Sequence, residues 1–149
     1  MRINTKYFGE IEINQEEVIH FPQGIPGFLE KKDFILLSFE ENGLFQVLQS
    51  TETIDPAFVV VNPFLFVKDY EFKLDDTTIE QLKIKQENDV LVLAIMTVKD
   101  PLATSTANLQ APIVINQNQK LAKQYITGNT KYTSKEKIFK QTSNTEGEK

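Results

Sequence analysis

The sequence of 149 residues contains no cysteine and no tryptophan, and it has a single histidine, His20. Without cysteine the chain can form neither a disulfide framework nor a thiolate site for zinc. With no cysteine and no second histidine, it cannot build a catalytic Cys–His dyad or a histidine-rich metal site. The glycine-rich loops that bind phosphates or dinucleotides and the G-x-S-x-G nucleophile turn are also missing. These absences exclude the most common enzyme classes.

Long hydrophobic runs are missing as well. The longest apolar run extends from Val90 to Met96, far short of the ~20 residues that a membrane helix needs. The first six residues lack the apolar core of a signal peptide. We therefore expect a cytoplasmic protein with no membrane association.

The composition is that of one globular domain. Hydrophobic residues make up 40% of the chain and charged residues 25%, which is too apolar for a disordered protein. Phenylalanine stands out with 11 residues. Large phenylalanine side chains suit the core of a sandwich or barrel, where they bridge facing sheets.

The net charge of −5 is unevenly distributed along the chain. Residues 1–90 carry a formal charge of −9, whereas residues 91–149 carry +4. An acidic body disfavours contact with a nucleic-acid backbone and favours encounter with a basic protein. The alternative is a solvated acidic surface that has no partner.

Short alternating or apolar stretches separated by turn residues predict β-strands. A hairpin is expected over residues 3–13, with Gly9 at its bend, and a strand pair around Asn42-Gly43. The remaining predicted strands cover residues 18–21, 58–61, 90–98, 111–116 and 122–127. The longest, Val90 to Val98, is apolar on both faces and is expected at the centre of the sheet, covered on both sides. The pattern predicts a mostly β fold, an antiparallel barrel-like or sandwich single domain.

One or two short helices complete this expectation. The spacing from Thr77 to Glu80 is that of a capping box, and Asp75 and Asp76 suit a helix N-terminus, so a helix is predicted over residues 76–83. Leu29 to Lys32 is expected to form one further turn. We place the binding domain at residues 1–132 and a polar, mobile tail at residues 133–149.

Two loops carry candidate surfaces. The loop Gly24-Ile25-Pro26-Gly27-Phe28 is expected to be structural, with Ile25 and Phe28 filling the core, although a contact surface is the alternative. For Asn108-Leu109-Gln110-Ala111-Pro112, structural and binding interpretations remain equally open.

The polar residues give little indication of catalysis or metal binding. A lone histidine within a strand, such as His20, is more often structural or exposed than catalytic. Asp69, Asp75 and Asp76 could hold Ca²⁺ or Mg²⁺, but the spacing of a calcium loop is absent and helix capping already explains the pair. We therefore predict no metal and no cofactor.

Taken together, several segments resemble one family. They are Gly24 to Phe28, Leu48 to Ser50, Asp69 to Phe72, Thr97 to Pro101 and, most specific, Ala107 to Asn116. In order and spacing the chain resembles the FliW family of flagellar assembly factors over roughly residues 2–132.

The resemblance implies a cytoplasmic protein that is not an enzyme and that binds two partners in turn. One is flagellin, and the other is the carbon storage regulator CsrA, an RNA-binding repressor of flagellin translation that the factor antagonises once flagellin has been exported. We expect a monomer that makes no direct contact with nucleic acid. The candidate partner-binding residues are Asp55, Asp69, Tyr70, Glu71, Asn108, Leu109 and Pro112.

Two other functions remain open from the residues alone. A hydrolase with paired carboxylates would need two acidic groups close in space, which the sequence does not reveal. A nucleic-acid-binding barrel would need a basic face with aromatic residues, whereas the lysines here cluster mainly after residue 119.

Overall fold

Short strands make up most of the regular secondary structure. The computed structural model describes residues 1–39 and 43–139. Its strands are β1 (Arg2–Thr5), β2 (Gly9–Glu12), β3 (Ile19–His20), β4 (Asp33–Ser38), β5 (Gln46–Ser50), β6 (Ala57–Val61), β7 (Val90–Thr97), β8 (Thr106–Ala107), β9 (Ile113–Asn116), β10 (Leu121–Gln124) and β11 (Glu136–Lys137). One α-helix, α1 (Asp76–Gln81), lies in these ranges, with the short 3-10 turns η1 (Gln15–Glu17), η2 (Pro63–Leu65), η3 (Glu87–Asp89) and η4 (Leu102–Thr104). The predicted mostly β, barrel-like fold is confirmed.

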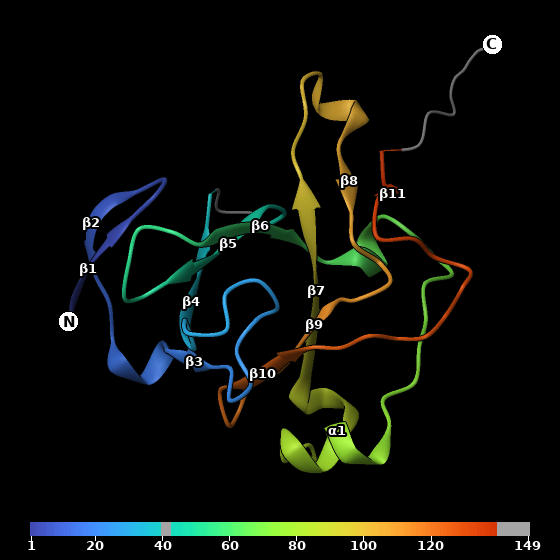
Figure 1. The fold of residues 1–149 in the computed structure, drawn as a ribbon, viewed down its shortest axis with the longest axis horizontal. Coiled ribbons are helices and arrows are strands. Elements are labelled where there is room, and N and C mark those ends of the chain that lie inside the picture. Colours follow the sequence, from blue (N-terminus) through green and yellow to red (C-terminus); the bar gives the residue numbers. More distant parts are fainter. Residues whose placement is uncertain (40–42, 140–149) are drawn as a thin grey trace.

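Seven strands close into a barrel (Figure 1). Around its wall they follow the order β7, β6, β5, β4, β3, β10 and β9, and β9 pairs with β7. Neighbouring strands run antiparallel except β3 and β10, which meet in parallel where Leu121 lies opposite His20. Beside the barrel, β8 and β11 extend the sheet from the end of β7, and β1 and β2 form a separate hairpin. Closure pairs strand edges that an open sheet would leave exposed.

Phenylalanine and branched aliphatic residues fill the barrel. Phe21 and Phe34 are fully buried, and their ring centroids lie 5.3 Å apart in an edge-to-face contact. Leu48 and Ile113 come from different parts of the wall and belong to the same cluster. Truncating one buried Phe typically costs ~3–5 kcal/mol, so the phenylalanine content is a main source of stability.

The central strand β7 matches the predicted strand at Val90 to Val98, apart from its last residue. It pairs with β6 on one edge and with β9 and then β8 on the other. Alternation sends Leu91, Leu93 and Ile95 toward the barrel core. Val90 and Val92 face outward, where the chain between β6 and β7 covers them. Both faces are therefore apolar because both are covered.

Helix α1 confirms the prediction for residues 76–83, but its cap differs from the predicted one. The Asp75 carboxylate accepts a hydrogen bond from the Thr78 backbone N–H at 2.8 Å, so Asp75 is the N-cap and Thr77 lies inside the first turn. Aspartate caps helices at least as well as threonine. The further turn expected at Leu29 to Lys32 is present as a single turn but not as a helix, and the Lys31 N–H donates to the Phe28 carbonyl there at 3.0 Å. Within the described ranges, no helix has the length and apolar character needed to cross a membrane.

The loop from Gly24 to Phe28 is only partly as predicted. Gly24 has φ of +71°, and a Cβ there would come within 2.7 Å of the Leu29 carbonyl oxygen, so glycine is required. Ile25 is buried in the barrel core. Phe28, however, is 42% exposed, and the expectation that it fills the core is wrong. Its ring makes an edge-to-face contact with Phe58, at a centroid distance of 5.6 Å, while Ile25 is the residue of this loop that enters the barrel core.

Part of the segment predicted as a tail, residues 133–139, contacts the rest of the domain. Strand β11 pairs with β8, Ile138 is buried, and Phe139 packs against Phe45 and Phe66. Ile138 and Phe139, two large apolar residues in an otherwise polar stretch, attach this segment to the domain. The rest of the predicted tail, residues 140–149, lies outside the described residues, as does Asn42 of the predicted Asn-Gly turn, whose flanking strands β4 and β5 do pair.

Candidate functional site

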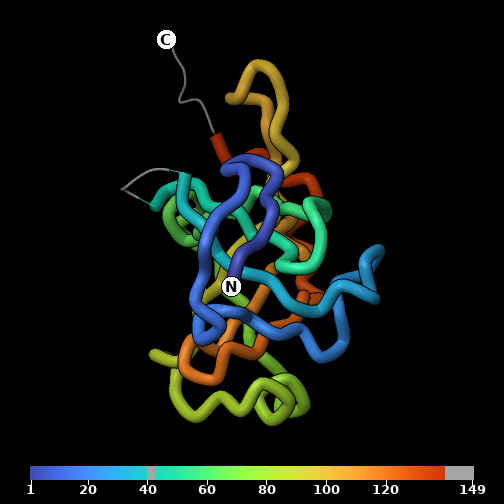
Figure 2. The backbone as a smooth tube through the Cα atoms, turned by 90° about the vertical axis from the view of Figure 1, so that its left-hand side faces the viewer, coloured from blue at the N-terminus to red at the C-terminus, as the bar shows by residue number. Residues whose placement is uncertain are grey.

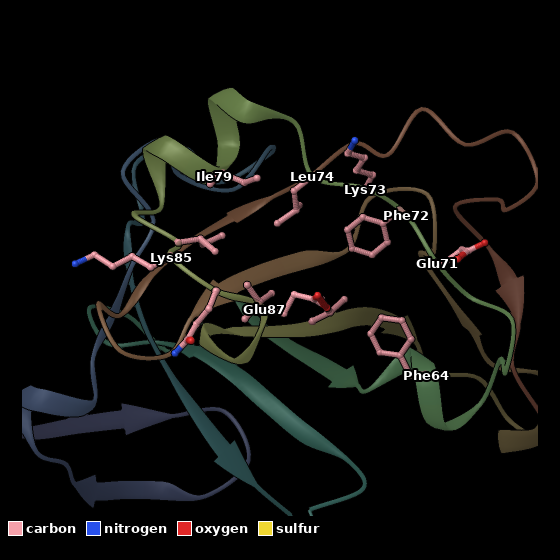
Figure 3. A pocket seen from close by; sticks show the side chains of 12 residues that line it. Phe64, Glu71, Phe72, Lys73, Leu74, Ile79, Lys85 and Glu87 are labelled. Atoms are coloured by element: carbon pink, nitrogen blue, oxygen red, sulfur yellow. The ribbon is translucent and has the colours of Figure 1, made fainter.

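The chain between β6 and β7 covers one end of the barrel, where α1 lies (Figure 2). With the outer face of β7 it forms a groove, the helix groove, with a volume of ≈ 700 Å³. Apolar side chains make its floor, and charged or amide side chains stand at its rim. The lining residues are Phe64, Glu71, Phe72, Lys73, Leu74, Ile79, Ile84, Lys85, Gln86, Glu87, Val90 and Val92. In Figure 3 the rings of Phe64 and Phe72 face into the groove, whereas the charged ends of Glu71 and Lys85 point away from its centre.

One wall of the helix groove is anchored by Tyr125, which follows β10. Its hydroxyl donates to the Lys73 carbonyl at 2.9 Å and accepts the Asp75 N–H at 3.2 Å. Its ring stacks on Phe72 with centroids 5.8 Å apart. A single side chain thereby satisfies two backbone groups of an irregular segment and also supplies apolar contact.

Two further tyrosines hold the start of the same wall. The Tyr70 hydroxyl donates to the Leu109 carbonyl at 2.7 Å, and the Tyr132 hydroxyl donates to the Asp69 carbonyl at 2.9 Å. Their ring centroids are 4.8 Å apart. Burial, with a smaller effect from Tyr132, raises the pKa of Tyr70, so its hydroxyl stays protonated and keeps donating at physiological pH.

The opposite wall is held by Asp89 and Asn116. The Asn116 side-chain amide donates to the Leu82 and Lys83 carbonyls at 2.8 and 3.1 Å, where Lys83 takes a left-handed φ of +57°. The Asp89 carboxylate accepts the Lys85 N–H at 3.0 Å and the Gln86 N–H at 3.2 Å. The bond from Lys85, and then the other donors, lower the pKa of Asp89 against an opposing effect of burial.

The wall that the three tyrosines hold carries exposed acidic side chains. We call this segment, residues 69–80, the acidic wall. It has five carboxylates and one lysine, all exposed: Asp69, Glu71, Asp75, Asp76 and Glu80, with Lys73. The Thr78 side chain, and then its backbone N–H, lower the pKa of Asp75, which keeps this carboxylate charged. An acidic rim above an apolar floor suits a partner surface that combines basic and apolar side chains.

The structure separates the predicted partner-binding residues into two groups. Asp55, Asp69 and Glu71 are exposed, and of these Glu71 lines the helix groove. Asp55 instead pairs with Lys6 at 3.3 Å on another part of the surface.

The other four predicted residues support the fold. Tyr70, Leu109 and Pro112 are buried, with Leu109 fully inaccessible, so these side chains are not exposed on the surface of the free chain. Asn108 is half-buried, and its side-chain oxygen accepts the backbone N–H groups of Gln110 and Ala111. The loop from Asn108 to Pro112 is therefore a structural turn, since its polar group bonds its own backbone and its apolar groups enter the core.

Several groove residues were missed by sequence reasoning, above all Ile79, Ile84, Lys85 and Glu87. One sequence feature could have indicated them: the outward-facing valines of β7 require a cover, and a long connection that could supply it, residues 62–89, follows β6. The tyrosine anchors left no such sign, because a tyrosine hydroxyl gives no indication in sequence of the carbonyl that it reaches.

Chemical groups for catalysis are sparse in the described ranges. His20 Nδ1 lies 2.7 Å from an Asp33 carboxylate oxygen, and both side chains are largely exposed on the barrel surface. Within residues 1–39 and 43–139, no three His, Asp or Glu side chains are grouped to hold a metal ion. The arrangement at the helix groove suits recognition of a surface.

Comparison with known proteins gives a consistent result. The family model described as FliW protein matches residues 2–138. A flagellar assembly factor FliW of Geobacillus kaustophilus (strain HTA426) is 50% identical over 139 residues, which cover 93% of this chain and 96% of that protein. The factor of the same name from Bacillus subtilis (strain 168) is 46% identical over 138 residues, with the same coverage of both chains. A crystal structure of a flagellar assembly factor FliW superposes with a TM-score of 0.90 at 48% identity, covering 96% of this chain and 100% of that one. These relatives are named as assembly factors, not enzymes.

Proposed function

The chain belongs to the FliW family of flagellar assembly factors, and from that premise we propose that it acts in the cytoplasm by binding flagellin and the regulator CsrA in turn. Flagellin occupies the chain while it awaits export. Once flagellin leaves, the free chain binds CsrA and relieves the repression of flagellin translation. No covalent step is required, because occupancy follows the concentration of each partner.

The observation that carries this proposal is the acidic wall above the apolar helix groove. An RNA-binding regulator presents basic side chains, and carboxylates at residues 69–80 steer such a partner during encounter. The apolar floor between Phe72 and Val92 then offers area to bury once the partner has docked.

Flagellin is proposed to use the same groove, mainly through its floor. The loop around Asn108 and Leu109 is less suitable for this contact because Leu109 is fully buried. Overlap at one groove makes the two partners mutually exclusive without any conformational change.

A catalytic use of the groove is less well supported. Glu71 and Glu87 both line it, but both are exposed to solvent. A carboxyl group that acts as a general acid is favoured by apolar surroundings, which neither residue has.

Charge removal on the acidic wall tests the first step. We expect the double variant Glu71→Gln/Glu80→Gln to bind CsrA with a slower association rate and a flatter salt dependence. Stopped-flow rates should converge with those of the parent as the screening length falls from ~10 Å at 0.1 M to ~3 Å at 1 M salt. The matched control Glu10→Gln/Glu17→Gln removes the same charge from residues 10–17, outside the groove. Equal effects of the two double variants would assign steering to net charge alone.

Disruption of the floor tests the shared groove. Ile79→Asp places a charge among the apolar lining residues, and we expect it to weaken binding of both flagellin and CsrA. Ile54→Asp, at a side chain that is 50% exposed elsewhere, is the matched control. A competition pull-down completes the test, since a ternary complex of chain, flagellin and CsrA would contradict the proposal of one shared groove.

A further inference from the structure

A second groove, the hairpin groove, lies beside the hairpin that joins β7 to β8. Figures 1 and 2 show this hairpin at the opposite end of the molecule from α1. It has a volume of ≈ 440 Å³. Its floor consists of Phe45, Val59 and Met96. In contrast to the helix groove, it is lined by no charged side chain of residues 1–39 or 43–139.

The rim of the hairpin groove is exposed and apolar. Tyr7, Phe39, Val98 and Leu102 have exposed fractions of 46%, 40%, 53% and 48%. They come from three separate stretches of the chain, since Val98 and Leu102 both belong to the connection between β7 and β8. Single exposed apolar residues are ordinary, whereas apolar residues that line one groove make it a candidate for binding.

A free strand edge runs along the same groove. The ladder between β6 and β7 ends at Val60 opposite Ile95, so the next two residues, Val59 and Met96, leave the pairing at the groove floor. The other edge of β7 is already taken, since β8 pairs with Met96 and Thr97 from that side. Val98 makes no backbone hydrogen bond to any residue in the described ranges. The groove therefore combines apolar side-chain positions with backbone groups that can accept another strand.

The chain's own C-terminal sequence does not suit this groove. The Phe139 ring lies 6.3 Å from that of Phe45 in the floor, and ten residues follow it in the sequence. None of those ten residues has a large apolar side chain. They cannot supply the apolar contact that the floor and rim offer.

We propose that the hairpin groove binds an extended segment of a partner protein, which adds as a strand to the free edge of β7 at Met96 to Val98. Main-chain hydrogen bonds to that edge supply affinity. Apolar side chains at every second position of the segment enter the groove, because alternate residues of a strand point to the same side. This site goes beyond the function proposed above, which uses the helix groove.

The probe for this site is a short fluorescent peptide of alternating valine and threonine with lysine at both ends. We expect it to bind the full chain in an anisotropy titration. A matched peptide with the same side chains but with N-methyl groups on alternate amides cannot pair along one edge. Its affinity should fall by about tenfold or more, which corresponds to one or two lost hydrogen bonds. Equal binding of both peptides would overturn the proposal.

Variants at Val98 give the second arm. Val98→Pro removes the N–H that would pair with the added strand, whereas Val98→Ala keeps it and shortens the side chain. We expect the proline variant to lose binding of the parent peptide by about tenfold or more, and the alanine variant to lose less. The melting temperature shows whether each variant folds. If Val98→Pro does not fold, the comparison of the parent and methylated peptides tests strand addition by itself.

Two further results would overturn the proposal in favour of another occupant. One is tighter binding of a helical peptide with an apolar face than of the alternating peptide. The other is a parent protein that sediments as a dimer and that Val98→Pro converts to a monomer, which would assign the groove to a second copy of the chain.

Discussion

The two grooves of this barrel differ in how they are built. The helix groove lies against irregular backbone, which buried polar side chains such as Tyr125, Asp89 and Asn116 hold in place. The hairpin groove lies between strands and hairpins, and its rim is made of exposed apolar side chains. Charged side chains follow one wall of the helix groove, whereas none of the described residues that line the hairpin groove is charged.

Because of this difference, a substitution can change binding without changing the stability of the fold in one groove but not in the other. Residues beneath the helix groove shape it and stabilise the fold together, so their substitution disturbs both properties. Residues at the rim of the hairpin groove can change with little effect on the fold. The following experiments compare matched substitutions in the two regions.

The largest effect is expected at Tyr125. Tyr125→Ala removes a buried ring and both backbone hydrogen bonds, and we expect a loss of ~3–5 kcal/mol in unfolding free energy. Tyr7→Ala, at the hairpin groove, should cost about 1 kcal/mol or less, because the ring is 46% exposed. Urea denaturation measures both values.

Tyr125→Phe refines the comparison. It keeps the stacking on Phe72 but leaves the Lys73 carbonyl and the Asp75 N–H without their partner, so an intermediate loss of ~1–2 kcal/mol is expected. Similar losses for Tyr125→Ala and Tyr7→Ala would remove the proposed difference between the grooves.

A moderate, pH-dependent effect is expected at Asp89. Its pKa is lowered in the folded chain, so its stabilisation is fully present above its unfolded pKa of about 4 and is lost as the pH falls through the lower folded value. Asp89→Asn should therefore lower the melting temperature at neutral pH and make stability depend less on pH in the acidic range. Glu10→Gln, in the β1–β2 hairpin, controls for the loss of one charge. Parallel melting curves of parent and Asp89→Asn between neutral and acidic pH would contradict this role.

The smallest effect is expected from truncation after Phe139. The deleted residues contain no large apolar side chain, so the melting temperature should stay unchanged and peptide affinity at the hairpin groove should change by less than about twofold. Truncation after Tyr132 is the informative contrast. It also removes Ile138, which is buried, and Phe139, and we expect it to destabilise the domain. Equal stability of the two truncated chains would instead support a domain that ends at residue 132.

Periodicity predicted the regular part of the fold well. Alternation and turn residues indicated the N-terminal hairpin, the strand pair formed by β4 and β5, the central strand and the closing pair β9 and β10. These patterns are local, so each strand can be recognised from the residues within it and beside it. The β3–β10 contact that closes the barrel has no such pattern, because it joins residues far apart in the sequence.

The site was predicted less well, for a physical reason. Polar or aromatic residues in loops were taken as contact residues, and Glu71 does line the groove. Tyr70 and Leu109 lie in equally loop-like sequence but are buried, because the Tyr70 hydroxyl bonds the Leu109 carbonyl inside the core. Burial of a loop residue depends on what packs over it, and sequence alone does not reveal that.

The parallel contact between β3 and β10 also has a consequence for the newly synthesised chain. His20 emerges from the ribosome early, but its partner Leu121 follows only after most of the sequence has been made. At ~5–20 residues per second, the first strands therefore wait for seconds before the barrel can close. Such a distant contact gives the fold a high contact order, which slows folding. Until β10 arrives, the edge of β3 and the phenylalanines beside it remain open to other chains. The barrel therefore cannot close until β10 has been synthesised.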